Sequence, residues 1–425
     1  MQKQNVLNLK TATLAVLTVL ASANTLAADP VVFRFSTVGD SRIDPTVAKA
    51  DPTILINGAL LPQDAQWLQN TKAWSRILRT VKTQHSSMLF MNGDMIMGYG
   101  KAAIPPSWST TAPATVNDVV NSDLVKFYTQ YAYWRGMVAS SLETGTYIVP
   151  VPGNHETQCN SANVSTAPAA SQVPCASGKK AAVENENAWR ANMGDLIDDL
   201  SANVRFKSVT GLLPLNASGL TSSTAPTSTT DAAISTDQSK LSYSFDVNTT
   251  AGRLHFAIVN TDAVGFDGHA PTGWLANDLA TAKTNGAKKF FVFGHKPAFT
   301  YQYLASGSVA AAGLDNDVTA RNEFWKVIAQ YNATYFTGHE HITKVDQHPD
   351  PTGTYTTMPY QVLVGAGGSP WDAKSSDVTV DPANDRSYIW ATVNVHASGR
   401  VSMGTFGFSN TFGPTALVER INNLQ

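Results

Sequence analysis

Short polar motifs containing Asp, Asn and His recur along this chain of 425 residues, each directly after an apolar run. Five of them carry residue types that bind metal ions: GDSR at 39–42, GD at 93–94, GNHE at 153–156, GHKP at 294–297 and GHEH at 338–341. A strand that runs into Gly and then Asp, Asn or His places these side chains in the loop beyond its carboxyl end. Ligands bind at that edge of open α/β sheets, so five such motifs predict one shared site.

The side chains in these motifs indicate a metal centre. The candidate ligands are carboxylate, amide and imidazole groups: Asp40, Asp94, Asn154, His295, His339 and His341. Such a mixed set suits Fe, Mn or Zn, and not a zinc site closed by cysteines. A carboxylate can bridge two cations, and a pair of ions roughly 3.5–4 Å apart activates water and holds both oxygens of an in-line displacement. His339 and His341 are separated by one residue, and we expect them to bind separate metals.

Strand-like and helix-like segments alternate around these motifs. The strands before the motifs are expected over 33–38, 88–91, 147–151, 290–293 and 335–336. Apolar stripes with helical periodicity predict helices over 67–81, 124–138, 274–283 and 324–331. Further strands are expected over 241–247, 254–261, 360–364, 388–395 and 400–408, the last two as a hairpin-like pair around Ser398 and Gly399. This alternation predicts an α/β fold with helices on the faces of a sheet.

The composition limits the class of protein. With 43% hydrophobic residues, the chain can bury a large core. Segments 102–116, 157–183 and 209–239 are rich in small polar residues, Ala and Pro, which predicts loop insertions of the kind that often border a site. Without a repeat or a clear linker, residues 29–425 are interpreted as a single catalytic domain. A net charge of −2 argues against a nucleic-acid partner, and a mean hydropathy of −0.13 excludes a polytopic membrane protein.

Residues 1–28 have the parts of a secretory signal peptide. A lysine-containing start precedes an apolar core over 12–23, and small residues at 21–23 form a cleavage motif. This core is shorter than the roughly 20 residues that span a membrane. We therefore expect export to the periplasm or the cell exterior, with no membrane span after removal of the signal. In an oxidising compartment, Cys159 and Cys175 are expected to form a disulfide.

The order of the motifs, GD-x, GD, GNHE, GHxP and GHxH, resembles that of the calcineurin-like metallophosphoesterases, the superfamily that includes purple acid phosphatases. The resemblance is to a secreted, bacterial-type member and covers residues 33 to about 370. It implies an α/β fold of two stacked mixed β-sheets flanked by helices, the αββα sandwich. It also implies two divalent or trivalent metal ions (Fe, Mn or Zn) and the hydrolysis of small phosphomonoesters by a hydroxide bound at the dinuclear centre.

The resemblance further implies how the ligands divide. Asp94 bridges both metals, and the other ligands form two sets: Asp40 and His341 at the first site, and Asn154, His295 and His339 at the second. His155 is then a histidine that binds no metal and lies near the leaving group, positioned by a neighbour such as Glu156.

Two positions depart from the pattern of these relatives. Their first motif usually reads Asp-x-His, but the third residue here is Arg42, whose guanidinium cannot bind a metal. We expect Arg42 to contact the phosphoryl oxygens of the substrate, with an ion pair to Asp44 or another loop carboxylate as the alternative. Purple acid phosphatases have a tyrosine three residues after the bridging aspartate, where this chain has Met97. The purple iron–tyrosinate group is therefore not predicted, although Tyr99 is close in sequence.

Other interpretations remain open at this stage. A phosphodiesterase could use the same site, and a degenerate first metal site would suit a non-catalytic metal-binding protein. His155 and Glu156 also fit the start of a helix, and Asp262 is interpreted as a residue that fixes a loop. The histidines outside the motifs are interpreted as ordinary core or surface residues: His85, His255, His269, His348 and His396. No G-x-S-x-G motif is present, so a serine hydrolase has no support.

Overall fold

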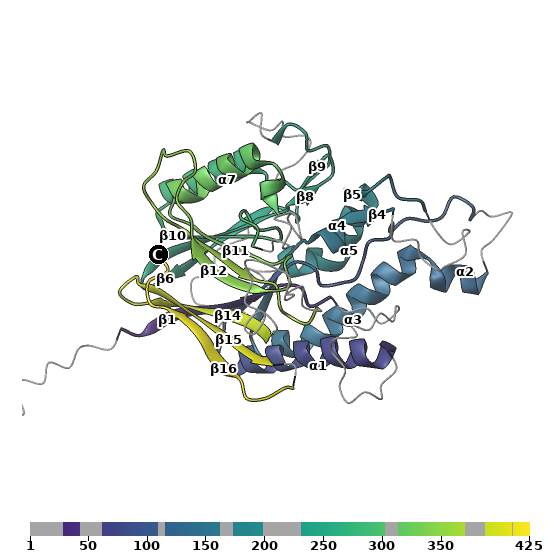
Figure 1. The fold of residues 1–425 in the computed structure, drawn as a ribbon, viewed down its shortest axis with the longest axis horizontal. Coiled ribbons are helices and arrows are strands. Elements are labelled where there is room, and N and C mark those ends of the chain that lie inside the picture. Colours follow the sequence, from purple (N-terminus) through teal and green to yellow (C-terminus); the bar gives the residue numbers. More distant parts are fainter. Residues whose placement is uncertain are drawn as a thin grey trace, which may run out of the picture.

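The computed structural model describes residues 29–42, 62–108, 115–161, 173–198, 231–301, 313–369, 387–409 and 411–425. The predicted signal peptide at 1–28, Asp44 and most of the tract at 209–239 lie outside these residues. The described residues form two six-stranded sheets with helices on their outer sides (Figure 1).

The first sheet has the strand order β16-β15-β14-β1-β2-β3. Its strands are β1 (Val31–Val38), β2 (Met88–Asn92), β3 (Tyr147–Val151), β14 (Ser387–His396), β15 (Val401–Ser409) and β16 (Ala416–Ile421). β1, β2 and β3 run parallel, whereas β14, β15 and β16 continue the sheet in antiparallel pairs. The loops after β1, β2 and β3 therefore leave the sheet at the same edge.

The second sheet has the order β12-β13-β11-β10-β7-β6. Its strands are β6 (Tyr243–Thr249), β7 (Gly252–Val259), β10 (Ala287–Gly294), β11 (Thr334–Thr337), β12 (Thr343–Gln347) and β13 (Tyr360–Val364). The four inner strands are parallel and the two edge strands are antiparallel to their neighbours. The loops after β10 and β11, which carry the GHKP and GHEH motifs, thus also leave at one edge.

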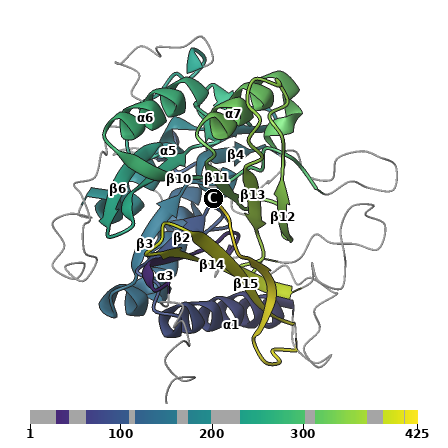
Figure 2. The same ribbon diagram turned by 90° about the vertical axis from the view of Figure 1, so that its left-hand side faces the viewer.

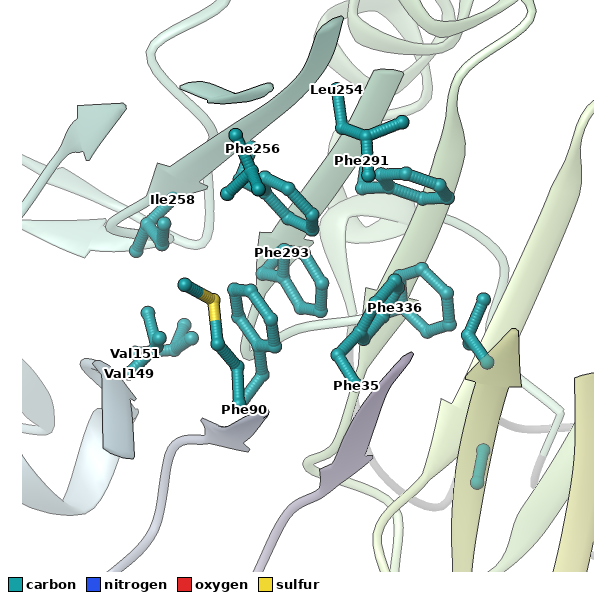
Figure 3. Packing of buried hydrophobic residues seen from close by; sticks show 14 of the residues in the cluster. Phe35, Phe90, Val149, Val151, Leu254, Phe256, Ile258, Phe291, Phe293 and Phe336 are labelled. Carbon is teal, nitrogen blue, oxygen red and sulfur yellow. The ribbon is translucent and has the colours of Figure 1, made fainter. Parts of the chain in front are cut away.

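An aromatic core fills the space between the two sheets (Figure 3). The Phe90 ring of the first sheet stacks on the Phe293 ring of the second, with centroids 3.9 Å apart. Phe35 meets Phe256 and Phe336 edge to face at 5.5 and 5.9 Å. Aromatic contacts of this geometry add to the burial of the rings themselves, and they hold the two sheets face to face.

Helices cover the outer faces of both sheets (Figure 2). α1 (Pro62–Thr83), α3 (Asp123–Glu143) and α5 (Val183–Asp198) bury apolar side chains against the first sheet, and α6 (Thr272–Thr284) and α7 (Val318–Gln330) do so against the second. The stripes predicted from periodicity form these interfaces, as when Trp74 stacks on Trp134 at 6.3 Å. The predicted arrangement of two stacked mixed sheets flanked by helices is confirmed.

Some elements differ from the sequence expectation. The sequence pattern does not predict the edge strands β12 and β16 or the helix α5, because polar and charged residues interrupt their apolar pattern. The expected loop at 157–183 contains β4 (Gln158–Asn160) and β5 (Lys179–Ala181), which pair antiparallel. The remaining short elements are α2 (Val116–Asn121), α4 (Asn154–Thr157), β8 (Asp262–Ala263), β9 (Phe266–Asp267) and the 3-10 turn Leu314–Asn316.

The predicted disulfide between Cys159 and Cys175 is present, with Cα atoms 5.5 Å apart. It joins β4 to the chain segment that leads into β5. Among the helices of the described residues, none is both long enough and apolar enough to cross a membrane.

Candidate metal centre

The loops at the carboxyl ends of the parallel strands of both sheets meet and bond to one another. Gly39 N donates to the carbonyl oxygen of Val364 at 2.7 Å, and Gly338 N donates to that of His295 at 3.0 Å. The loops bring together all six side chains predicted as ligands: Asp40, Asp94, Asn154, His295, His339 and His341. Five of these residues are buried and His339 is half-buried. The five motifs thus form one site.

Four ligand atoms form what we call the second cluster: Oδ1 of Asp94, Oδ1 of Asn154, Nε2 of His295 and Nδ1 of His339. Asn154 Oδ1 lies 2.9 Å from each of the two imidazole nitrogens. His295 Nε2 lies 3.1 Å from Asp94 Oδ1 and 3.2 Å from His339 Nδ1. Ligand atoms that are about 2.1 Å from one ion, at right angles, are about 3 Å apart. These four separations match those between ligands of one metal ion.

His295 is oriented so that Nε2 faces this cluster. Its Nδ1 lies 2.7 Å from the carbonyl oxygen of Asn92, which leaves Nε2 directed toward Asp94. A backbone partner at the far nitrogen is the usual way to fix the orientation of a metal-binding histidine. Burial lowers the pKa of His295, but Asp94 outweighs it and raises the pKa to about 9. The surroundings therefore favour a positive charge at Nε2, whether from a proton or from a metal ion.

The remaining predicted ligands form the first cluster: Asp40, His341 and the shared Asp94. One ligand atom from each lies within 4.8 Å of the others. Asp40 is fully buried, and its Oδ2 accepts a hydrogen bond from the backbone N–H of His339 at 2.9 Å. Its Oδ1 accepts none from the described residues, and His341 Nε2, at 3.5 Å, is beyond normal hydrogen-bond length. Burial raises the pKa of Asp40. A buried, unsatisfied carboxylate oxygen is costly, and a neighbouring cation would relieve that cost.

Three of the predicted ligands have a backbone conformation that residues other than glycine rarely adopt. The φ angle is 61° at Asp40, 55° at Asp94 and 73° at His339. Non-glycine residues in this region carry conformational strain, which concentrates at functional sites. The glycines beside them make room for the turns: a Cβ on Gly338 would stand 2.4 Å from Asp40 Oδ2, and one on Gly93 would stand 2.5 Å from His295 Nδ1.

Arg42 lies between the first cluster and His155. Its Nη2 lies 2.6 Å from His341 Nε2, its Nη1 lies 2.7 Å from His155 Nε2, and its Nε donates to Ser369 Oγ at 3.0 Å. The nearest carboxylate oxygen among its ion pairs in the described residues is that of Asp94, at 4.0 Å. The guanidinium points into the site, and Asp44 lies outside the residues that the structure describes.

His155 and Glu156 both start a helix and belong to the site. They lie in the four-residue helix α4, whose first turn Glu156 caps. The sequence predicts that Glu156 positions the His155 side chain, but the structure shows a different role. The Glu156 carboxylate accepts hydrogen bonds from four backbone N–H groups, those of Gly153, Asp94, Met95 and Ile96, at 2.8 to 3.0 Å. The His155 ring is oriented by the carbonyl oxygen of Met97, which contacts Nδ1. Glu156 therefore holds the loop after β2 and the loop after β3 together through their backbone N–H groups.

Tyr99 is a residue of the site that sequence reasoning left aside. Its hydroxyl accepts a hydrogen bond from Asn154 Nδ2, and its ring lies against His155 with centroids 3.7 Å apart. Because Nδ2 is held in this way, Asn154 Oδ1 is turned toward the second cluster. The ammonium of Lys179 on β5 lies 5.1 Å from the centroid of the Tyr99 ring. Only the closeness of Tyr99 to Asp94 in the chain pointed to this role.

Asp262 and His255, which are interpreted from the sequence as structural residues, make contacts within the fold. Asp262 is fully buried, pairs with Lys296 Nζ at 2.6 Å and accepts from Gln158 at 2.9 Å, which ties three loops together. His255, outside the motifs, lies between Asp246 and Asp278 on the outer side of the second sheet.

Comparisons with known proteins give matches among solved structures alone, since neither a family model nor a curated protein matches the chain. One match is a purple acid phosphatase from yellow lupin (Lupinus luteus) seeds, with 11% identity and a TM-score of 0.49 over 91% of this chain and 53% of that chain. This chain thus spans about half the length of that protein. Another is a dimetal phosphatase from Danio rerio, with 11% identity and a TM-score of 0.42 over 92% of this chain and 100% of that chain. Both likenesses are distant, so the function is inferred from the site itself.

Proposed function

We propose that this protein is a metal-dependent phosphoesterase that hydrolyses phosphate esters, small phosphomonoesters in particular. The observation that carries the proposal is that carboxylate, amide and imidazole ligands from five loops converge, almost all buried, into two clusters that share Asp94. The motif order, which resembles that of the calcineurin-like metallophosphoesterases, supports the same function.

The donor set defines what the site would hold. Asp94, Asn154, His295 and His339 would bind one ion, and Asp40, Asp94 and His341 are the ligands available for another. Mixed oxygen and nitrogen ligands suit Fe, Mn or Zn. Ions bound there would lower the pKa of a bound water molecule. They would also compensate the negative charge that develops on the phosphoryl oxygens.

The other residues of the site would bind and orient the ester. The Arg42 guanidinium has the planar fork that matches phosphoryl oxygens, and it is held in place by contacts on three sides. The His155 ring contacts Arg42 through Nε2, where it could exchange a proton with the leaving-group oxygen. Tyr99 covers the His155 ring and keeps it from turning.

Two other functions use the same residues. A phosphodiesterase would need the same metal ligands, and a non-catalytic metal-binding protein would need neither Arg42 nor His155. The contact between the side chains of these two residues, inside the site, favours an enzyme.

The three functions separate in one experiment. The purified protein is analysed for metals, and a chromogenic monoester and diester are assayed side by side with added Mn, Zn or Fe. Hydrolysis of the monoester in preference to the diester is expected. Preference for the diester would favour the phosphodiesterase, and metal binding without hydrolysis of either ester would refute the proposal.

We also infer that the protein is exported. The composition of residues 1–28 and the disulfide between Cys159 and Cys175 support this inference. The mature protein should begin between Asn24 and Asp29, and should show no free thiol before reduction. Mass spectrometry that finds Met1 on secreted protein would refute the predicted cleavage.

A further inference from the structure

The first cluster already contains a cation, the guanidinium of Arg42. We propose that this guanidinium replaces a metal ion there, so that the protein holds one tightly bound ion per chain, at the second cluster. The inference deepens the proposed function and rests on it for the metal dependence of the site. It differs from the two-ion centre that the motif resemblance implies.

The contact with His341 is the first reason. Arg42 Nη2 lies 2.6 Å from His341 Nε2 and 3.3 Å from Nδ1 of the same ring, so the guanidinium lies against the ring beside Nε2. A metal ion bound to Nε2, at about 2.0–2.1 Å from the nitrogen, would stand directly beside this cation. Two positive charges at such a short distance repel each other, so guanidinium and metal ion compete for the space at His341.

The second reason is that the guanidinium is fixed in this position. Ser369 Oγ accepts from Nε at 3.0 Å, His155 Nε2 contacts Nη1 at 2.7 Å, and the backbone N–H of Arg42 donates to the carbonyl oxygen of Asp94 at 2.8 Å. Only 15% of the side chain is exposed. A side chain held at both its backbone and its head group loses little further entropy on binding, so it is a strong competitor for the site.

Charge is the third reason. Asp40 and Asp94 bring two carboxylates into a buried space, and buried carboxylates require compensation. Arg42 Nε lies 4.0 Å from Asp94 Oδ2, and an arginine guanidinium is a permanent cation, so it compensates part of this negative charge.

The two clusters differ in completeness. The second cluster offers four candidate ligand atoms, and four of the separations between them are 2.9 to 3.2 Å. The first offers three, one of which is shared, and these lie within 4.8 Å of one another. An ion should therefore enter the second cluster first and remain there. At the first cluster, the substrate phosphoryl group would meet a permanent guanidinium fork.

The test counts metal ions. Metal-free protein is titrated with Mn²⁺, followed by calorimetry and by the electron paramagnetic resonance of the bound ion. Wild type should bind one Mn²⁺ per chain tightly and show the spectrum of an isolated ion. Arg42→His removes the guanidinium and adds a ligand, so it should bind two and show magnetic coupling between them. Arg42→Met, which removes the guanidinium alone, should gain a second and weaker Mn²⁺ site.

A charge-matched control separates this effect from a general loss of positive charge. Lys179→Met also removes one cation near the site, but its ammonium lies over the Tyr99 ring and not in the first cluster. This variant should still bind one Mn²⁺. Melting temperatures and far-ultraviolet circular dichroism of all variants confirm that they are folded, and two independent Arg42 variants guard against the failure of one.

The outcomes also distinguish this inference from the proposed function. Two tight Mn²⁺ ions in wild type would overturn the inference, even if the protein hydrolyses phosphate esters. One ion in wild type and in both Arg42 variants would also overturn it, because the guanidinium would not be what excludes the second ion. One ion in wild type and two in Arg42→His, without hydrolysis of any ester, would support the inference and refute the function.

Discussion

Arg42 and His155 are in direct contact, with Nη1 of the guanidinium 2.7 Å from Nε2 of the imidazole. Because arginine can only donate, His155 accepts at Nε2 and carries its proton on Nδ1, which faces the carbonyl oxygen of Met97. Burial and the charge of Arg42 lower the pKa of His155, although Asp94 opposes them. His155 is therefore neutral in this arrangement, and its Nε2 must leave Arg42 and gain a proton before it can protonate a leaving group.

His155→Ala should keep its metal and its melting temperature but lose activity by roughly 10²–10⁴-fold, the usual range for a positioned proton donor. The loss should be smallest for esters with good leaving groups, which depart without protonation. Rates are measured for a series of aryl phosphates that differ in leaving-group pKa. An equal loss across the series would show that His155 acts by holding Arg42 and not as an acid.

Arg42→Ala should lower kcat/KM by roughly 10–100-fold when one equivalent of metal is present, because a charged hydrogen bond to the phosphoryl group is worth about 1.5–3 kcal/mol. Arg42→Lys should recover only part of the kcat/KM that is lost in Arg42→Ala, since an ammonium lacks the planar fork of a guanidinium. Steady-state kinetics on one monoester give the comparison. If Arg42→Ala lowers the melting temperature and leaves kcat/KM unchanged, Arg42 has a structural role and no contact with substrate.

Asp94→Ala should lose metal and activity together, since Asp94 belongs to both clusters and lies 3.1 Å from His295 Nε2. Elemental analysis after gel filtration measures the metal. The control is Asp195→Ala, which removes an aspartate that pairs with Arg135 at 2.6 Å away from the site, and which should keep the normal metal content. Normal metal content in Asp94→Ala would contradict its assignment as a ligand.

Glu156→Gln should destabilise the fold and weaken metal binding at the same time. The carboxylate accepts four backbone N–H groups on two oxygens, and an amide group retains only one acceptor oxygen. Two buried donors would then lack partners, at roughly 1–3 kcal/mol each. Denaturant unfolding measures the loss. An unchanged free energy of unfolding would mean that the loops around Asp94 do not depend on this clamp.

The stability of the protein should depend on pH through His255, far from the metal ligands. Burial lowers its pKa, but bonds to Asp246 at 2.7 Å and Asp278 at 2.8 Å outweigh it and raise the pKa from 6.5 to about 9. Below pH 6.5 both states bind the proton, so the stabilisation is complete. As the pH rises to about 9, the unfolded chain loses its proton first, and a contribution of about 3 kcal/mol disappears.

Unfolding by denaturant at several pH values between 6 and 9.5 checks this prediction. Wild type should lose stability over that interval, and His255→Gln should be less stable at pH 6 with a flatter dependence on pH. His269→Gln changes a half-buried histidine outside this network, which pairs with Asp317 at 3.3 Å, and it should keep the wild-type slope. The same slope in His255→Gln as in wild type would exclude His255 as its cause.

Much of the architecture follows from local pattern. The strand over 147–151 has the predicted bounds, and the inner strands before the other motifs begin and end within a few residues of expectation, because continuous apolar runs mark buried parallel strands. Edge strands such as Ala416–Ile421, with mostly exposed residues, carry no such run. Their pairing is decided by the neighbouring strand, so the sequence pattern missed them.

The sequence by itself determined which side chains could bind a metal, because Asp, Asn and His in loops after strands are recognisable one motif at a time. Only the tertiary structure decided which of these side chains lie together in each cluster and which other residues contact them. Arg42 reaches His155 and His341, which are 113 and 299 residues away along the chain, and Tyr99 turns the amide of Asn154. These contacts depend on the packing of two sheets against each other, and on where each loop then points its side chains. No local pattern contains that information, since it arises only when segments distant in sequence share one buried space.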